Sequence, residues 1–159
     1  MADRIRIDRA LWLGLLGDLR RRGGGGHESG AFLLGRIEAG RRIVETCVFY
    51  DDLDPRAYAS GVCVLHADAF DALWRTCRAR GLTVVADVHT HPYGAGQSLA
   101  DRQNPMVARV GHIALIVERF AADPVWRHRL GVYRYEGSHR WTNLSGWTAR
   151  TFLETGTFA

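Results

Sequence analysis

The chain predicts a single mixed α/β domain in which helices flank a central β-sheet. Two observations support this: strand-like and helix-like segments alternate along the chain, and its 159 residues can fill one compact core but not two ordinary ones. Hydrophobic residues make up 47% of the sequence and charged residues 24%, as in soluble globular proteins. We therefore assign residues 1–159 to one domain.

The first part of the chain is expected to run strand, helix, hairpin, loop, strand. Leu11, Leu15 and Leu19 repeat at helical spacing after Asp8, a residue type that caps helices, and four glycines follow the segment. The turn Glu38-Ala39-Gly40 separates two apolar segments that read as paired strands. The expected elements are a strand at 4–7, a helix at 8–22, strands at 29–37 and 42–50, a loop at 51–60 and a strand at 61–65.

The second part is expected to contain a helix capped by Asp68, whose buried stripe recurs at i, i+3, i+4 and i+7. The stripe comprises Phe70, Leu73, Trp74 and Cys77, and Gly81 ends the helix. The remaining elements are a strand at 82–89, a loop at 92–97, a short helix within 98–110, a strand at 113–117, a hairpin of 130–135 and 140–143, and a closing helix at 145–155.

The segment 84–92, with the sequence VVADVHTHP, carries the clearest chemical pattern. Successive side chains of a strand point to opposite faces. Alternation therefore predicts an apolar face formed by Val84, Ala86 and Val88. It predicts an opposite face that becomes polar toward its end, formed by Val85, Asp87, His89 and His91.

His89 and His91 stand two positions apart, so their Cα atoms should lie about 6–7 Å apart on one side of the strand. Two imidazoles at that spacing can converge on one metal ion. Asp101 follows through a glycine-bearing loop and can supply a third ligand, which leaves one position open for water, as in catalytic zinc sites. Hydrolysis further needs a base for the water and a donor for the oxyanion, and the hydroxyl of Ser98 is a candidate donor.

The motifs H-T-H-P and S-L-A-D, preceded upstream by H-E-S-G-A-F-L-L-G, resemble the JAMM (JAB/MPN) metalloprotease family. The resemblance covers about residues 28–117. It implies that Glu28 is the general acid/base, that His89, His91 and Asp101 are zinc ligands, and that Ser98 stabilises the oxyanion. Six residues separate His91 from Ser98, where the family commonly has seven.

The same resemblance implies an MPN-like domain, with layering of the cytidine-deaminase type, and a zinc-dependent isopeptidase. Such an enzyme would cleave after the C-terminal glycine of a ubiquitin-like protein, in deconjugation or precursor processing. Bacterial members of this kind accompany E1-like and E2-like proteins. Two alternatives stay open: a non-catalytic MPN scaffold, and a peptidase that acts on an adduct of a sulfur-carrier protein. Other hydrolases that use an H-x-H motif usually need a barrel of about 250 residues, which exceeds this chain.

Several polar residues have competing interpretations. Asp87 is either a partner that orients a ligand histidine or a solvated sheet residue. Ser98 and Asp101 also have the spacing of a helix capping box, which is compatible with a catalytic role. The remaining histidines have no partner at ligand spacing and are interpreted as structural or surface residues; they are His27, His66, His112, His128 and His139.

Charge and cysteine content argue against several functions. All 21 basic residues are arginines, the net charge is +4, and only Arg20–Arg22 cluster, which argues against nucleic-acid binding. The lack of lysine fits either GC-rich coding bias or avoidance of self-modification beside a lysine-conjugating system. The apolar run 11–16 is too short for a membrane span. Three widely spaced cysteines favour reduced thiols and a cytoplasmic location.

Overall fold

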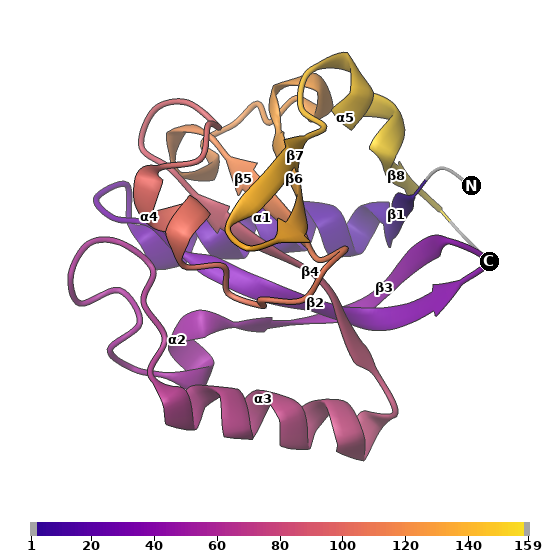
Figure 1. The fold of residues 1–159 in the computed structure, drawn as a ribbon. Coiled ribbons are helices and arrows are strands. Elements are labelled where there is room, and N and C mark those ends of the chain that lie inside the picture. The colour runs from indigo at the N-terminus through magenta and orange to yellow at the C-terminus, as the bar shows by residue number, and fades with distance from the viewer. Residues whose placement is uncertain (1–2, 158–159) are drawn as a thin grey trace.

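The computed structural model describes residues 3–157 and contains one mixed sheet, in the strand order β7-β6-β5-β4-β2-β3-β1-β8 (Figure 1). Strand β1 runs parallel to β3 and β8, β4 runs parallel to β5, and the other neighbours are antiparallel. The strands are β1 Arg4–Asp8, β2 Gly30–Glu38, β3 Arg41–Phe49, β4 Thr83–Thr90, β5 Ile113–Val117, β6 Gly131–Gly137, β7 Arg140–Asn143 and β8 Leu153–Gly156. This confirms the predicted mixed α/β class.

Helices cover both faces of the sheet, and Figure 1 shows α1 and α3 on opposite sides of it. The helices are α1 Arg9–Gly23, α2 Tyr50–Leu53, α3 Ala67–Arg80, α4 Leu99–Gln103 and α5 Trp147–Phe152, with short 3-10 turns at Arg119–Ala121 and Arg127–Arg129. None of the helices within residues 3–157 has both the length and the apolar character needed to cross a bilayer.

Two apolar clusters hold these layers together. The larger cluster packs α1 and α5 against one face of the sheet through Trp12, Leu15, Leu19, Ala149 and Phe152, among others. The smaller cluster packs α2 and α3 against the other face through Phe32, Leu34, Tyr50, Leu73 and Cys77. The leucine stripe of α1 is therefore buried as predicted, whereas Trp74 of the α3 stripe stays 37% exposed.

The N-cap predicted from the sequence is confirmed for α1 but not for α3. The Asp8 carboxylate accepts a hydrogen bond of 2.8 Å from the Ala10 N–H, as expected of an N-cap, and Gly24 ends α1 in the left-handed conformation. Asp68 does not cap α3: the helix begins one residue earlier, after His66, which places Asp68 in the first turn.

A β-bulge in β4 overturns the predicted assignment of its faces. In the pairing with β2, Leu33 lies opposite Ala86, and the next residue, Leu34, lies opposite Val84. Val85 has no partner of its own on β2 and is the extra residue of the bulge. Val85 consequently joins Ala86 and Val88 in the larger cluster, whereas Val84 packs in the smaller one. A bulge adds one residue and reverses the alternation before it, so Val84 lies on the same side of the sheet as His89.

Three further segments differ from the expected elements. Residues 61–65 begin with a bend and form no strand, and the loop expected at 51–60 begins with the helical turn α2. Helix α4 ends at Gln103. The closing helix stops at Phe152 because Leu153–Gly156 form β8, which pairs in parallel with Ile5–Asp8.

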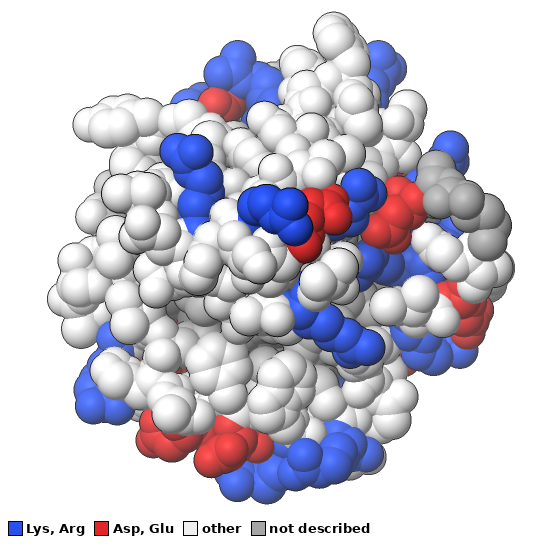
Figure 2. All heavy atoms as spheres, in the orientation of Figure 1, with Lys and Arg blue, Asp and Glu red and all other residues white. Residues whose placement is uncertain are grey.

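Charged side chains are spread over the surface, and most arginines on the face in Figure 2 stand singly or beside acidic residues. Arg4 pairs with Glu154 at 2.9 Å, and Arg36 pairs with Glu38 at 2.9 Å and with Glu45 at 2.5 Å. The expectation that the protein does not bind nucleic acid therefore stays a prediction consistent with this distribution.

The segment between α2 and α3 is folded around one buried carboxylate, that of Asp54. Its Oδ2 accepts hydrogen bonds from the backbone N–H of His66 at 3.0 Å and from Nδ1 of the same residue at 2.5 Å. Its Oδ1 accepts a bond of 3.0 Å from the Arg56 N–H. These hydrogen bonds lower the pKa of Asp54 well below its usual range, with the His66 side chain the largest cause.

We expect Asp54→Asn to lower the unfolding temperature at neutral pH and to matter progressively less in acid. A depressed carboxyl pKa contributes stability that is complete above the unfolded-state value of about 3.9 and is lost as pH falls through the folded-state value. Urea unfolding between pH 7 and pH 3 tests this, with the exposed Asp71→Asn as the control. An equal loss of stability at every pH would contradict the assigned cause.

Candidate active site

His89 and His91 lie at the carboxyl end of β4, beside the parallel strand β5. The backbone is fixed on both sides, because the Thr90 N–H donates to the Ser29 carbonyl and the His91 N–H to the Val117 carbonyl, each at 2.9 Å. Both imidazoles face the same side of the sheet and are buried, with 6% and 9% of their surfaces exposed. The predicted shared orientation of this pair is therefore present.

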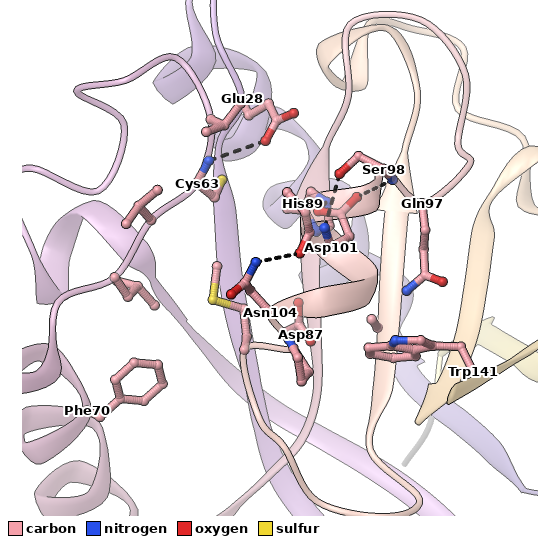
Figure 3. Close-up of a pocket in the computed structure, with 17 residues that line it drawn as sticks. Glu28, Cys63, Phe70, Asp87, His89, Gln97, Ser98, Asp101, Asn104 and Trp141 are labelled. Atoms are coloured by element: carbon pink, nitrogen blue, oxygen red, sulfur yellow. Dashed lines mark hydrogen bonds and ion pairs between the residues drawn. The ribbon is translucent and has the colours of Figure 1, made fainter. Parts of the chain in front are cut away.

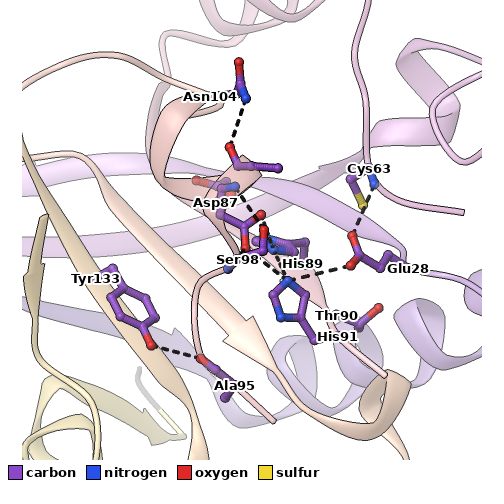
Figure 4. Close-up of polar contacts among 12 residues, drawn as sticks. Glu28, Cys63, Asp87, His89, Thr90, His91, Ala95, Ser98, Asn104 and Tyr133 are labelled. Carbon is purple, nitrogen blue, oxygen red and sulfur yellow. Dashed lines mark hydrogen bonds and ion pairs between the residues drawn. The ribbon is translucent and has the colours of Figure 1, made fainter. Parts of the chain in front are cut away.

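The two imidazoles lie side by side (Figure 4), and the Asp101 carboxylate contacts both. The Nε2 atoms of His89 and His91 are 3.0 Å apart. One carboxylate oxygen of Asp101, Oδ1, lies 3.3 Å from His89 Nε2, and the other, Oδ2, lies 3.2 Å from His91 Nε2.

These separations suit a tetrahedral divalent metal ion. Bonds of about 2.0–2.1 Å place the ligand atoms of such an ion about 3.3–3.4 Å from one another. Two imidazole nitrogens can approach this closely, with a carboxylate beside them, when a cation lies between their lone pairs. Nδ1 of His89 is buried and bonds to no described residue, so the polar contacts of this ring within residues 3–157 are made through Nε2.

Helix α4 orients Asp101 through a capping box. The Asp101 N–H donates to Ser98 Oγ at 3.1 Å, and the Ser98 N–H donates to Asp101 Oδ2 at 2.7 Å. Asp101 therefore takes part in the helix cap and faces the two histidines at the same time, a combination that the sequence pattern allowed. The six-residue spacing after His91 still brings Ser98 and Asp101 to the histidines.

Strand β6 contacts the loop 92–97 and holds it in place. The Tyr133 hydroxyl donates a hydrogen bond of 3.1 Å to the Ala95 carbonyl. Gly131 lies under the same carbonyl, because a Cβ at this position would be only 2.1 Å from the Ala95 oxygen. On the far side of α4, the Trp141 indole N–H donates to the Arg102 carbonyl at 3.1 Å.

Glu28 reaches the histidines from the segment that precedes β2. Its backbone N–H donates to the Gly61 carbonyl at 3.1 Å, and its Oε2 accepts a bond of 3.2 Å from the Cys63 N–H. Its Oε1 lies 3.7 Å from His91 Nε2. Glu28, His89 and His91 each offer an atom within 4.8 Å of the others, so they form a group that could hold a metal ion.

Electrostatics tie Asp101 to the histidines. Burial acts to lower the pKa of His89, but the Asp101 hydrogen bond and charge outweigh it, so the pKa is raised. Burial acts to raise the pKa of Asp101, yet the hydrogen bonds from His89 and His91 lower it well below its usual range. The carboxylate is therefore ionised and available as a ligand across the neutral range.

Both interpretations of Asp87 are wrong, because it neither orients a ligand histidine nor is solvated, with only 2% of its surface exposed. Its carboxylate instead accepts a bond of 2.6 Å from His112 Nε2 and a bond of 3.0 Å from the Tyr50 hydroxyl. His112, interpreted above as an ordinary structural or surface residue, is buried at 5% exposure and is the partner of this carboxylate. The pairing depends on register, since Asp87 stands opposite Ala114 and His112 immediately precedes β5.

Two other histidines also have local partners. The ring of His27 contacts that of Tyr58 at an angle of 34°, with centroids 5.3 Å apart, and its Nδ1 lies 2.7 Å from the Glu28 carbonyl oxygen. His66 binds Asp54, as described above. His27 and His66 therefore support the segments that hold Glu28, rather than the metal-facing group itself.

A cavity of about 480 Å³ opens directly onto this group (Figure 3). Its polar end contains Glu28, His89, Ser98 and Asp101, and its floor includes Asp87. The rest is mostly apolar, with walls formed by Val62, Val64, Leu65, Phe70, Pro105, Met106, Ala114 and Trp141. Four of the five site residues predicted from the sequence thus line one cavity, and the fifth, His91, lies behind it in contact with His89 and Asp101. Their individual roles stay predictions.

Comparisons with known proteins agree with a metal-dependent site. No family model matches the chain. A protein of Sinorhizobium fredii named "Probable metalloprotease y4jG" is 28% identical over 127 residues, which cover 79% of this chain and 78% of that protein.

Two solved structures share the fold. The solution structure of protein DSY2949 from Desulfitobacterium hafniense superposes with a TM-score of 0.68 at 15% identity, covering 97% of this chain and 94% of that one. A protein from Salinibacter ruber gives a TM-score of 0.52 at 23% identity, covering 82% and 84%. At these identities the two structures support the fold alone. The metalloprotease relative and the group Glu28, His89 and His91 together support a metal-dependent peptidase.

We expect a divalent metal ion to raise the unfolding temperature more at pH 8 than at pH 6. Metal binding requires neutral histidines, and the raised pKa of His89 lets protons compete at higher pH than usual. Without metal, the protonated His89 stabilises the fold at low pH, and this contribution is lost as pH rises. Each proton displaced costs about tenfold in apparent affinity per pH unit below that pKa.

Thermal unfolding with and without added metal at the two pH values measures this difference. His91→Asn should remove the metal-dependent shift, and the matched change His128→Asn in the 3-10 turn Arg127–Arg129 should retain it. A metal-induced shift that grows as pH falls would contradict the assigned ligands.

We expect Gly131→Ala to weaken metal binding by displacing the Ala95 carbonyl and with it the loop that leads to Ser98 and Asp101. Tyr133→Phe removes one hydrogen bond to the same carbonyl and should cost about 1 kcal/mol of stability. Metal titration measures the first effect and urea unfolding the second. Gly94→Ala is the control, because a Cβ there meets nothing within 4 Å. Equal metal affinity in the Gly131 and Gly94 variants would show that the loop is anchored elsewhere.

Proposed function

We propose that the protein is a zinc-dependent peptidase of the JAMM type, with an MPN-like arrangement of its layers. The convergence of His89, His91 and Asp101, at separations of 3.0–3.3 Å, carries this proposal. Two imidazoles and a carboxylate with an open fourth position are typical of catalytic zinc sites. A non-catalytic scaffold would not need two buried imidazoles held this close to a carboxylate.

Zinc bound to these three side chains would polarise the scissile carbonyl and lower the pKa of a water at the open position. Glu28 is placed to act beside it as the proton carrier. Its Oε1 faces the cluster, while its Oε2 is held by the Cys63 N–H. In the reaction, Oε1 accepts the proton of the attacking water and then delivers it to the leaving amine nitrogen, which breaks the peptide bond.

Ser98 is the proposed oxyanion donor. Its Oγ accepts the Asp101 N–H, which leaves the hydroxyl hydrogen free to point into the cavity that Ser98 lines. A donor fixed in advance stabilises the developing negative charge without reorganisation. The hydroxyl oxygen caps α4 while its hydrogen faces the substrate.

The proposed substrate is the extended tail of a ubiquitin-like protein, cleaved after its C-terminal glycine. Residues 62–65 form a wall of the cavity outside any strand or helix, and Val62 and Val64 are 48% and 45% exposed. The carbonyls of Cys63 and Leu65 accept no hydrogen bond within residues 3–157. An extended tail can pair with such a segment by strand addition.

This assignment places the protein in one pathway with E1-like and E2-like enzymes. The cysteines Cys47, Cys63 and Cys77 are free thiols, which suits the reducing cytoplasm where we propose the enzyme works. An adduct of a sulfur-carrier protein would use the same glycine-ended tail, so both substrates belong in the test.

We expect the purified protein to hold one zinc ion and Glu28→Gln to keep the zinc but lose about 10²–10⁴-fold in kcat, the range for removal of a general acid/base. Metal analysis and cleavage of a ubiquitin-like protein with a C-terminal extension measure both quantities. The exposed Glu38→Gln serves as the control. Undiminished cleavage by the Glu28 variant would remove this residue from the mechanism, and absence of zinc would overturn the proposed class.

A further inference from the structure

A second cavity, of about 650 Å³, adjoins the active-site cavity and shares Gln97 and Trp141 with it. It is lined by Gln97, Arg102, Tyr133, His139, Arg140, Trp141 and Asn143. No aspartate or glutamate is among these lining residues. We call this feature the arginine groove.

The arginine groove carries two positive charges that no ion pair within residues 3–157 neutralises, although Glu136 lies close enough for the charge of Arg140 to help lower its pKa. Arg102 on α4 and Arg140 on β7 are both exposed and form no ion pair within residues 3–157. Glu136 lies on the same hairpin as Arg140, but its carboxylate is bound by Arg134 at 2.9 Å and by the Thr142 hydroxyl at 2.7 Å. Its charge is therefore largely committed to those partners.

The neighbouring active-site cavity has the opposite character. Three carboxylates line it, those of Glu28, Asp87 and Asp101. Trp141 and Gln97 form the boundary between this cavity and the arginine groove. Figure 3 shows Cys63 on one side of His89 and Asp101, with Gln97 and Trp141 on the other side. A chain that crosses the catalytic group from one side to the other passes from a carboxylate-lined region to an arginine-lined one.

We propose that the arginine groove binds an acidic segment on the amine side of the scissile bond. The direction rests on the proposed function: if the tail pairs with residues 62–65, the segment released by cleavage leaves over Trp141. Carboxylates of that segment then lie between Arg102 and Arg140, where guanidinium groups form charge-assisted hydrogen bonds. The enzyme thereby selects its substrates by the acidic partner released, in addition to the tail.

The test uses two substrates that differ only beyond the scissile bond. Each is a ubiquitin-like protein with a short amidated extension, rich in glutamate in one and in glutamine in the other. We expect the wild type to cleave the glutamate substrate about threefold to tenfold more efficiently in kcat/KM, as suits partly exposed ion pairs. This preference should fall at high salt.

Arg140→Gln should reduce the preference, Arg140→Lys should restore part of it, and Arg102→Gln with Arg140→Gln should bring the ratio close to one. Zinc content is measured for each variant because Arg102 neighbours the ligand Asp101. The control is Arg78→Gln, an exposed arginine at the end of α3, which should keep the wild-type ratio. A wild-type ratio of one, or a full preference in the double variant, would overturn the proposal.

Binding separates this proposal from the proposed function. Fluorescence anisotropy compares the free glutamate-rich and glutamine-rich amidated peptides on the zinc-loaded protein. Charge-dependent binding that is lost in the double variant, without cleavage of either substrate, would support the groove and overturn the peptidase assignment. Cleavage of both substrates at equal rates, without charge-dependent binding, would support the peptidase assignment and overturn the proposed role of the arginine groove.

Discussion

The close approach of two buried imidazole nitrogens, 3.0 Å apart beside an ionised carboxylate, is the constraint on which the rest of the structure depends. Unpaired charge in such a place costs several kcal/mol, and either a bound metal ion or a proton on the imidazoles would offset it. The flanking elements hold the constraint in place. Strands β2 and β5 fix the backbone of His89 and His91, and the capping box fixes Asp101. A catalytic site built in this way is positioned by secondary structure, which gives the precision that chemistry needs.

Two segments approach the strand end from opposite sides. The segment 54–66, folded around Asp54, brings the Cys63 N–H to Glu28 and so orients the carboxylate that we propose as the proton carrier. The loop 92–97, fixed by Gly131 and Tyr133, delivers Ser98 and Asp101 from the other side. Because the segment 54–66 and the loop 92–97 are anchored to different parts of the sheet, the cavity between them remains open for an extended substrate.

The charges around the cavity differ from one end to the other. Carboxylates gather near the proposed zinc site, where in our proposal they would hold the cation and carry a proton. Arg102 and Arg140, which form no ion pair within residues 3–157, lie beyond Trp141, where we propose that they meet an acidic chain. A buried carboxylate, that of Asp87, lies below the site and is held by His112 and Tyr50. It joins β4, β5 and α2 without contacting the metal-facing nitrogens.

The sequence by itself determined the features that depend on a few neighbouring residues: the Asp8 cap, the leucine stripe of α1, the shared side of His89 and His91, and the capping box of Ser98 with Asp101. Tertiary structure decided what depends on register and on distant partners. The bulge at Val85 follows from pairing with β2, and the Asp87–His112 pair follows from parallel pairing with β5. Residues 153–156 became a strand because β1 offered a free edge. Local propensity acts over about one turn or one strand pair, so it cannot specify contacts between segments that only the folded chain brings together.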